Sequence, residues 1–255
     1  MRKMLFARWA ISLVSLALIA SATPARAEMS EIKVAKQYGI SYLPLMIMED
    51  QKLIEKQAKA QGVDVAVSWA TFAGGNVMND ALLSNSLQFA SGGVGPFVTL
   101  WSRTRGNLDV RAVAAINSMP LYLNTRNPNV KTIKDFTDKD KIALPAVKIS
   151  IQAITLQMAA EKAFGDGQQN KLDPLTVTLS HPDAQTALLS GQSEITAHFG
   201  SPPFQYQQLR APAIHTVLNS YDVLGGRLIV ARRFCLIQRF ALKPGKWTQY
   251  HAGFA

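Results

Sequence analysis

The chain has 255 residues, of which 48% are hydrophobic, and its 27 basic and 17 acidic residues give a formal net charge of +10. Four basic residues precede residue 28 and six follow Gly226, so the 17 basic residues between them balance all 17 acidic ones. This neutral body gives no reason to expect a nucleic-acid or membrane partner. The single cysteine, Cys235, excludes a disulfide framework and a thiolate metal site, so the fold must depend on burial of apolar side chains.

The first 27 residues have the pattern of a secretory signal peptide. A basic start (Arg2, Lys3, Arg8) precedes an apolar run over 9–20 and the small-residue end Ala25-Arg26-Ala27. An uncleaved membrane anchor is the alternative, but a spanning helix needs about 20 apolar residues. We expect cleavage after residue 27, and no cysteine follows that site to accept a lipid. The mature protein is therefore expected in the periplasm, soluble and without a lipid anchor.

From residue 31 onward, short β-like runs alternate with helical segments, which predicts an α/β fold. The predicted strands are 32–35, 63–69, 87–90, 111–116, 141–144 and 175–179, and the predicted helices are 43–60, 78–83, one that begins at Pro96, and 151–164.

The two halves of the chain resemble each other. The tetrapeptide at Ala81–Ser84 recurs at Ala187–Ser190, and the same offset aligns Pro96 with Pro202. Each half then reads as a helix, a Leu-Leu-Ser end, a strand, a small-residue turn and a proline-initiated helix. This repetition predicts two similar lobes that face one cleft.

Four strand-to-helix junctions are the predicted ligand site, because ligands of open parallel sheets bind where strands end and helices begin. These junctions lie at 38–42, 91–95, 147–150 and 198–201. Free amide groups at helix N-termini bind anions without a formal counter-charge, and serine hydroxyls add donors. The alternative is that the glycines form turns and the serines cap helices.

Larger side chains at these junctions are open to two interpretations. Tyr38, Tyr42 and Phe199 could form apolar walls of the site or pack in the core. Lys148 could pair with an anionic ligand or be a solvated surface lysine. The four histidines lack metal-ligand spacing, and no nucleophile elbow, phosphate loop or dinucleotide fingerprint is present, so no metal, cofactor or catalytic residue is predicted.

Several passages resemble the nitrate/sulfonate/taurine (NitT/TauT)-type substrate-binding proteins of ABC transporters, a family that includes thiamine-precursor-binding proteins. The passages that carry the resemblance are Tyr38–Leu45, Asn79–Ser84, Phe89–Gly93, Ala187–Gly191 and His198–Phe204. The resemblance implies a type II periplasmic-binding-protein fold, with two α/β lobes joined by hinge segments and a ligand cleft between them. It also implies a monomer that delivers a small molecule to an ABC permease and ATPase complex. The candidate ligand-binding residues are Tyr38, Ile40, Ser41, Tyr42, Ser91, Gly92, Gly93, Asn117, Lys148, Ser150, His198, Phe199 and Ser201.

The end of the chain departs from this family. Relatives continue after the double glycine with more of lobe one, whereas Gly225-Gly226 leads here into a basic segment without an acidic residue. A frame shift near residue 226 is the hypothesis. The expected division is a signal peptide (1–27), lobe one (28–118), lobe two (119–214), a return to lobe one (215–226) and an atypical, possibly frame-shifted tail (227–255).

The function predicted from the sequence is capture of a small solute for an ABC importer. The expected solute is an anionic sulfonate, nitrate or carboxylate, or a pyrimidine-like molecule. Two alternatives stay open: a pyrimidine-precursor biosynthetic enzyme on the same fold, and a ligand-sensing module.

Overall fold

The computed structural model describes residues 31–225 and 235–238 of the chain. The predicted signal peptide and most of the predicted tail lie outside the described residues. The described residues form one compact unit. No helix within the described ranges is long and apolar enough to cross a membrane.

The first of two sheets has the strand order β2-β1-β3-β10-β4. Strand β1 (Glu31–Gln37) pairs in parallel with β2 (Ala66–Phe72) and β3 (Phe89–Gly92). Strand β10 (Cys235–Gln238) lies between β3 and β4 (Arg111–Ala115) and runs antiparallel to both. Four residues of the predicted tail thus complete this sheet.

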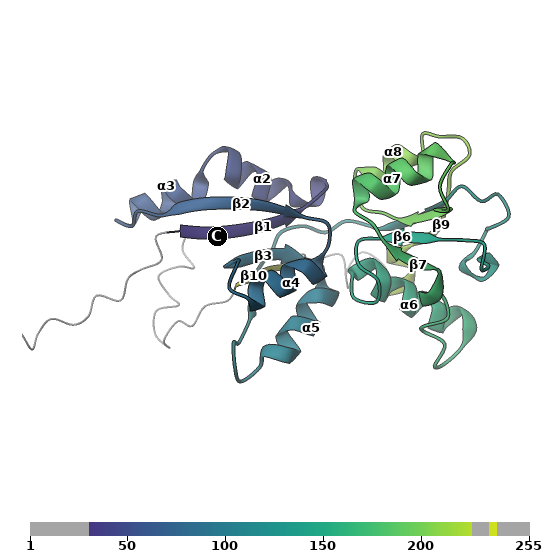
Figure 1. Cartoon of the computed structure of the whole chain (residues 1–255), viewed down its shortest axis with the longest axis horizontal. Helices are drawn as coiled ribbons and strands as arrows, with labels where there is room; N and C mark the ends of the chain where they lie inside the picture. Colours follow the sequence, from purple (N-terminus) through teal and green to yellow (C-terminus); the bar gives the residue numbers. More distant parts are fainter. Residues whose placement is uncertain (1–30, 226–234, 239–255) are drawn as a thin grey trace, which may run out of the picture. The chain divides into compact units, whose positions relative to one another are not determined.

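Helices cover both faces of the first sheet (Figure 1). The short turn η1 (Ile40–Tyr42) and the helices α2 (Leu43–Asp50) and α3 (Leu53–Ala60) lie on one face, and α4 (Gly75–Leu83) and α5 (Val94–Thr104) lie on the other. Two separate apolar clusters result. On one side Tyr42 and Leu45 pack against Trp69 and Phe89, and on the other Met78, Leu82 and Leu100 pack against Phe72 and Phe97.

The second sheet has the order β7-β6-β8-β5-β9. Its parallel part is β6 (Ile142–Leu144) between β7 (Thr176–Thr178) and β8 (Ala197–Phe199), and β5 (Tyr122–Thr125) runs antiparallel to β8 and to β9 (His215–Asn219). Both sheets therefore have the same plan. The central strand, β1 or β6, lies between the next two strands of the chain, and the second of these, β3 or β8, pairs antiparallel with a strand from a distant part of the chain, β10 or β5. This plan agrees with the repeat in the sequence, and the predicted α/β class is confirmed.

Helix α6 (Ile151–Phe164) packs on one face of the second sheet and α7 (His181–Ser190) on the other. The smaller helices are α8 (Phe204–Gln208), α9 (Ser220–Leu224), η2 (Ile133–Asp135) and η3 (Asp173–Leu175). Helices α6 and α7 begin where the sequence rules expect, because the hydroxyls of Ser150 and Ser180 accept from the backbone N–H groups of Ala153 and Asp183.

The predicted return of residues 215–226 to lobe one is wrong. Strand β9 pairs with β5 in the second sheet, and Val223 and Leu224 of α9 lie in the core of that sheet. The physical reason is burial: these two side chains are at most 9% exposed there.

Several predicted element boundaries also differ from the structure: the predicted helix 78–83 begins three residues earlier, and the predicted strand 87–90 begins and ends two residues later. The predicted helix 43–60 is two helices, because the backbone at Lys52 turns left-handed with φ of 52°. The predicted strand 63–69 begins and ends three residues later. Helix α5 begins at Val94, so Pro96 lies inside its first turn, where a backbone N–H is not needed.

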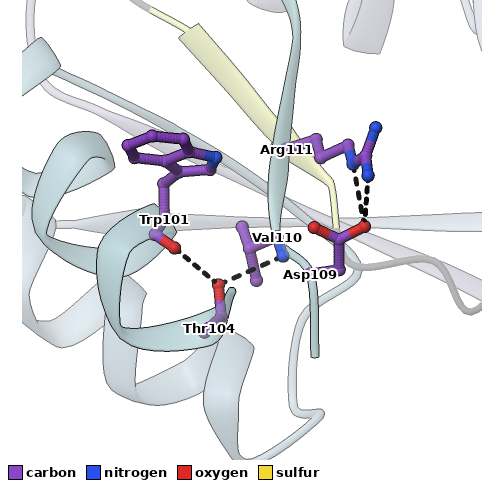
Figure 2. A network of polar contacts seen from close by, with 5 residues as sticks. All are labelled: Trp101, Thr104, Asp109, Val110 and Arg111. Carbon is purple, nitrogen blue, oxygen red and sulfur yellow. Dashed lines mark hydrogen bonds and ion pairs between the residues drawn. The ribbon is translucent and has the colours of Figure 1, made fainter. Parts of the chain in front are cut away.

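The turn between α5 and β4 is held by side-chain bonds (Figure 2). The Thr104 hydroxyl accepts from the backbone N–H of Val110 at 3.2 Å and donates to the Leu100 carbonyl at 2.9 Å. Next to it, the Arg111 guanidinium donates to the carboxylate of Asp109, with Nε 2.9 Å from Oδ2. Thr104 and Val110 are buried, whereas Arg111 is exposed. Thr104 is therefore the side chain that ties this turn to the core.

Candidate functional site

Helices and loops of both sheets line a hollow with an empty volume of about 340 Å³, a figure that includes solvent at its mouth. The lining residues from the first half are Gln37, Tyr42, Gly75, Gly93 and Pro96, and those from the second half are Pro145, Ser150, Ile151, Gln152, His181 and Ser201.

The N-terminal ends of four helices contribute to this lining. Gly75 and His181 are the first residues of α4 and α7, and Gly93 and Ser150 are the caps of α5 and α6. These helices have nine to fourteen residues, so their first backbone N–H groups carry the partial positive charge of a helix N-terminus. The hollow is therefore a favourable place for negative charge.

No lining residue is a lysine, arginine, aspartate or glutamate. The two titratable side chains are Tyr42 and His181. Burial raises the pKa of the Tyr42 hydroxyl well above its ordinary value. Burial lowers the pKa of His181 to about 4. Both side chains are therefore neutral near pH 7, and the donors that face a ligand carry no formal charge.

Glycines allow the two halves to approach closely around the hollow. A Cβ at Gly93 would lie 2.8 Å from the Cβ of Ile151, and one at Gly39 would lie 2.8 Å from the Pro202 carbonyl oxygen. That same carbonyl accepts from the backbone N–H of Ile40 at 3.2 Å. A side chain at Gly93 would push into the wall of the hollow.

A buried histidine pair belongs to the wall formed by the second half: His181 lines the hollow, and His198 lies outside the lining. His181 Nδ1 is 2.9 Å from His198 Nε2, and the other nitrogen of each ring faces a glutamine, Gln152 or Gln208. Burial, and then the neighbouring His181, lower the pKa of His198, partly opposed by its bond to Gln208. Phe204 stacks on the His181 ring with ring centroids 5.6 Å apart. This pair is neutral and tightly enclosed.

Four of the thirteen residues predicted from the sequence line the hollow: Tyr42, Gly93, Ser150 and Ser201. Their loops come from all four predicted junctions. The predicted junctions therefore do meet around one space, although most of the individual side chains named for it do not line it.

Several predicted side chains lie within a sheet or in the core instead of facing the hollow. The Ser91 hydroxyl donates to the Ala35 carbonyl at 2.7 Å within the sheet, next to Gly92 at the end of β3. Phe199 is fully buried in the core of the second sheet. His198 contacts His181 and is itself outside the lining.

The remaining predicted residues, Tyr38, Ile40, Ser41, Asn117 and Lys148, are also absent from the lining. Tyr38 and Ile40 are exposed, as is Lys148, so the solvated-lysine interpretation agrees with its position. Ser41 is buried with its hydroxyl 3.6 Å from the sulfur of Met119, and its carbonyl accepts from the Asn117 amide.

The sequence reasoning missed seven lining residues: Gln37, Gly75, Pro96, Pro145, Ile151, Gln152 and His181. Two further strand-to-helix junctions, 72–75 and 178–181, would have been found by the rule that identified the other four. Gln152 had no such signal, because a glutamine in the first turn of a helix is common and usually exposed. Within the described residues, no three histidine, cysteine or acidic side chains are grouped as a metal site.

This arrangement of two α/β halves around a hollow lined by helix N-termini is the periplasmic-binding-protein fold, as solved structures show. No family model matches the chain, and no curated protein matches it by sequence. The alkanesulfonate-binding protein SsuA from Xanthomonas axonopodis pv. citri, bound to MOPS, is 18% identical with a TM-score of 0.63 over 84% of this chain and 67% of its own.

Two other solved structures give the same fold. The periplasmic aliphatic sulphonate binding protein SsuA from Escherichia coli is 19% identical, with a TM-score of 0.56 over 83% of this chain and 66% of its own. A Candida albicans gene product with the generic periplasmic binding protein fold is 16% identical, with a TM-score of 0.55 over 74% of this chain and 59% of its own. This chain thus covers about two thirds of the length of these two sulfonate-binding proteins.

Proposed function

We propose that this chain is the solute-binding component of an ABC importer, and that it holds a small acceptor-rich solute in the hollow described above. Among acceptor-rich solutes, the lining favours a small oxyanion, such as a sulfonate, nitrate or a carboxylate. A pyrimidine-like ring with several acceptors is the neutral candidate. The fold supports this proposal, since solved structures with this fold include sulfonate-binding proteins.

The observation that carries the proposal is the meeting of four helix N-termini around one neutral hollow. Partial positive charge from N–H groups stabilises an anion without a counter-ion, and Ser150, Ser201 and Gln37 add polar side chains. Because the lining has no carboxylate, a ligand with a positive group would find no counter-charge there. The site should therefore prefer acceptors over donors.

Binding without chemical turnover is part of the proposal. The lining holds no carboxylate, lysine or cysteine, and its single histidine is neutral and already bonded within the wall. General acid-base chemistry needs a group whose pKa lies near the working pH, and burial lowers the pKa of His181 to about 4. These properties suit reversible capture.

The proposed partners are an ABC permease and its ATPase, and the proposed location is the periplasm, with the mature protein acting as a monomer. The division into lobe one (28–118) and lobe two, now extended through residue 224 to include β9 and α9, belongs to this proposal. So do the signal peptide over 1–27 and the frame-shifted tail after residue 226.

A thermal-shift and calorimetry screen of the purified full chain tests this function. The probes are methanesulfonate, taurine, MOPS, nitrate, acetate and an aminopyrimidine. A ligand at about 100 times its Kd stabilises a protein by about 2.7 kcal/mol, which raises the Tm of a domain of this size by about 5–10 °C. Ethylammonium serves as the control cation and should give no shift. Absence of a shift with every probe, in a sample with a cooperative unfolding transition, would contradict the proposal.

A further inference from the structure

A continuous line of buried polar side chains runs through the second half and ends at the hollow. It consists of Asn124 on β5, Gln208 on α8, His198 on β8, His181 on α7 and Gln152 on α6. All five are at most 5% exposed. Successive polar atoms lie 3.1, 2.5, 2.9 and 3.3 Å apart. We call this line the relay.

The direction of the relay is set at Asn124. Its amide nitrogen lies 2.9 Å from the main-chain carbonyl of Gln205, which can only accept, and its oxygen accepts from the Thr216 hydroxyl at 2.7 Å. The Asn124 atom that faces Gln208 is therefore the donor nitrogen, and the Gln208 atom 3.1 Å from it must be the acceptor oxygen. The Gln208 amide nitrogen must then donate to His198 Nδ1.

The proton positions on the two rings follow from this direction. Since Nδ1 of His198 accepts, a neutral ring carries its proton on Nε2 and donates to His181 Nδ1. His181 in turn carries its proton on Nε2, which faces the Gln152 amide at 3.3 Å. The structure places Nε2 of Gln152 toward His181, but two N–H donors cannot bond to each other, so we assign the Gln152 amide the opposite orientation, in which its oxygen faces His181 and its NH₂ group is left for the hollow.

We propose that the relay makes this wall a hydrogen-bond donor, with Gln152 as the residue that selects an acceptor atom of the ligand and the two histidines as positioning residues. This inference rests on the proposed function and narrows its substrate class: the ligand places an oxyanion or another acceptor against Gln152, and molecules that place an ammonium or guanidinium group there are rejected.

The physical reason is that all bonds of the relay point the same way. Hydrogen bonds in a chain polarise one another, so the last N–H group is a stronger donor than an isolated amide. Burial keeps both imidazoles neutral, because it lowers the pKa of each ring. The relay and the four helix N-termini therefore present the same polarity to the hollow.

The tautomers are tested first, by ¹⁵N NMR of the imidazole nitrogens in the full chain at pH 7. His181 and His198 should both be protonated on Nε2, and replacing the donor with Gln208→Met should remove the fixed tautomer of His198. The same change at Gln207, which is exposed on the same helix, should leave both spectra unchanged. A proton on Nδ1 of His181 in the unmodified chain would overturn the inference.

Binding of methanesulfonate by Gln152→Glu tests the donor role. The carboxylate still accepts from His181 but presents an oxygen to the anion, so affinity should fall at least 30-fold. Gln168→Glu adds the same charge at an exposed position outside the lining and should change affinity less than twofold. If Gln152→Glu does not fold, the neutral Gln152→Met variant should still weaken binding about fivefold to tenfold.

The two proposals fail in different ways. If the unmodified chain binds none of the probes, the transport function falls while the NMR spectra still decide the direction of the relay. In the other case the unmodified chain binds methanesulfonate, and the Gln152→Glu variant (or Gln152→Met, if the first does not fold) binds it equally well. The transport function then stands, and the donor role of Gln152 is wrong.

Discussion

His181 and His198 form a buried pair, with Nδ1 of His181 2.9 Å from Nε2 of His198. One ring lines the hollow and the other is fully buried behind it. Two adjacent imidazoles without a neighbouring carboxylate are stable when neutral, because protonation would leave a charge without a partner in a desolvated place. This contact therefore links the chemistry of the hollow to the stability of the second half.

Acid should destabilise the protein well above the pH at which carboxylates titrate. Burial lowers the pKa of His181 to about 4 in the folded chain, against about 6.5 for an unperturbed histidine, so the unfolded chain binds more protons between these two values. The contribution of this group is complete above pH 6.5 and is lost as the pH falls, reaching about 3 kcal/mol at pH 4. Urea unfolding at pH 7.5 and pH 5.0 measures it.

The matched variants for this prediction are His181→Gln and His215→Gln. The first should reduce the loss of stability between the two pH values. The second should retain it, since His215 is only partly buried and bonds the Val130 carbonyl away from the pair. An unchanged pH dependence in His181→Gln would show that another group is responsible.

A methyl group at Gly93 should weaken ligand binding more than it affects folding. The backbone there has φ of −68°, which alanine adopts without strain, but the added Cβ would meet Ile151 across the hollow. We expect at least a tenfold loss of methanesulfonate affinity in Gly93→Ala, measured by calorimetry.

Gly106→Ala is the opposite case. Gly106 has φ of 75° with nothing within 4 Å of an added Cβ, so alanine should cost about 1 kcal/mol in backbone strain and leave affinity unchanged. Equal affinity losses in the two variants would mean that general destabilisation, and not contact across the hollow, causes the effect.

The Thr104 hydroxyl should matter for stability although it lies outside the hollow. Thr104→Val keeps the shape of the side chain but leaves the buried backbone N–H of Val110 without its acceptor (Figure 2), which costs about 1–3 kcal/mol. Chemical denaturation measures this loss. Thr99→Val on the same helix removes only a bond to the Gly95 carbonyl and should cost less than 0.5 kcal/mol. A smaller loss at Thr104 than at Thr99 would rule out this explanation.

Removal of the Lys148 charge should leave ligand affinity within twofold. This lysine is exposed and is absent from the lining, so an anion in the hollow is stabilised by N–H groups instead of by its ammonium group. Calorimetry of Lys148→Met with methanesulfonate at low and physiological salt checks the point. A tenfold loss at both salt concentrations would show that Lys148 reaches the ligand.

Local patterns in the sequence determined the α/β class, the similarity of the two halves and the four loops that surround the hollow. Each depends on residues near each other in the chain: apolar runs, serine caps such as Ser150, and glycine turns such as that at Gly93. The assignment of β9 failed because strand partners are chosen by burial across long separations, and residues 215–219 pair with residues 90 or more positions earlier in the chain.

Only the tertiary structure decided which side chains face the hollow. Ser91 and Phe199 lie at predicted junctions, yet the Ser91 hydroxyl bonds the Ala35 carbonyl within the sheet and the Phe199 ring packs in the core. His181 lies at the strand-to-helix junction 178–181, but Gln152 gave no signal in the sequence, because its role depends on partners from four other elements. A hydrogen-bond direction that begins at Asn124 and ends at Gln152 exists only when five distant side chains are buried together, and burial is a property of the folded chain.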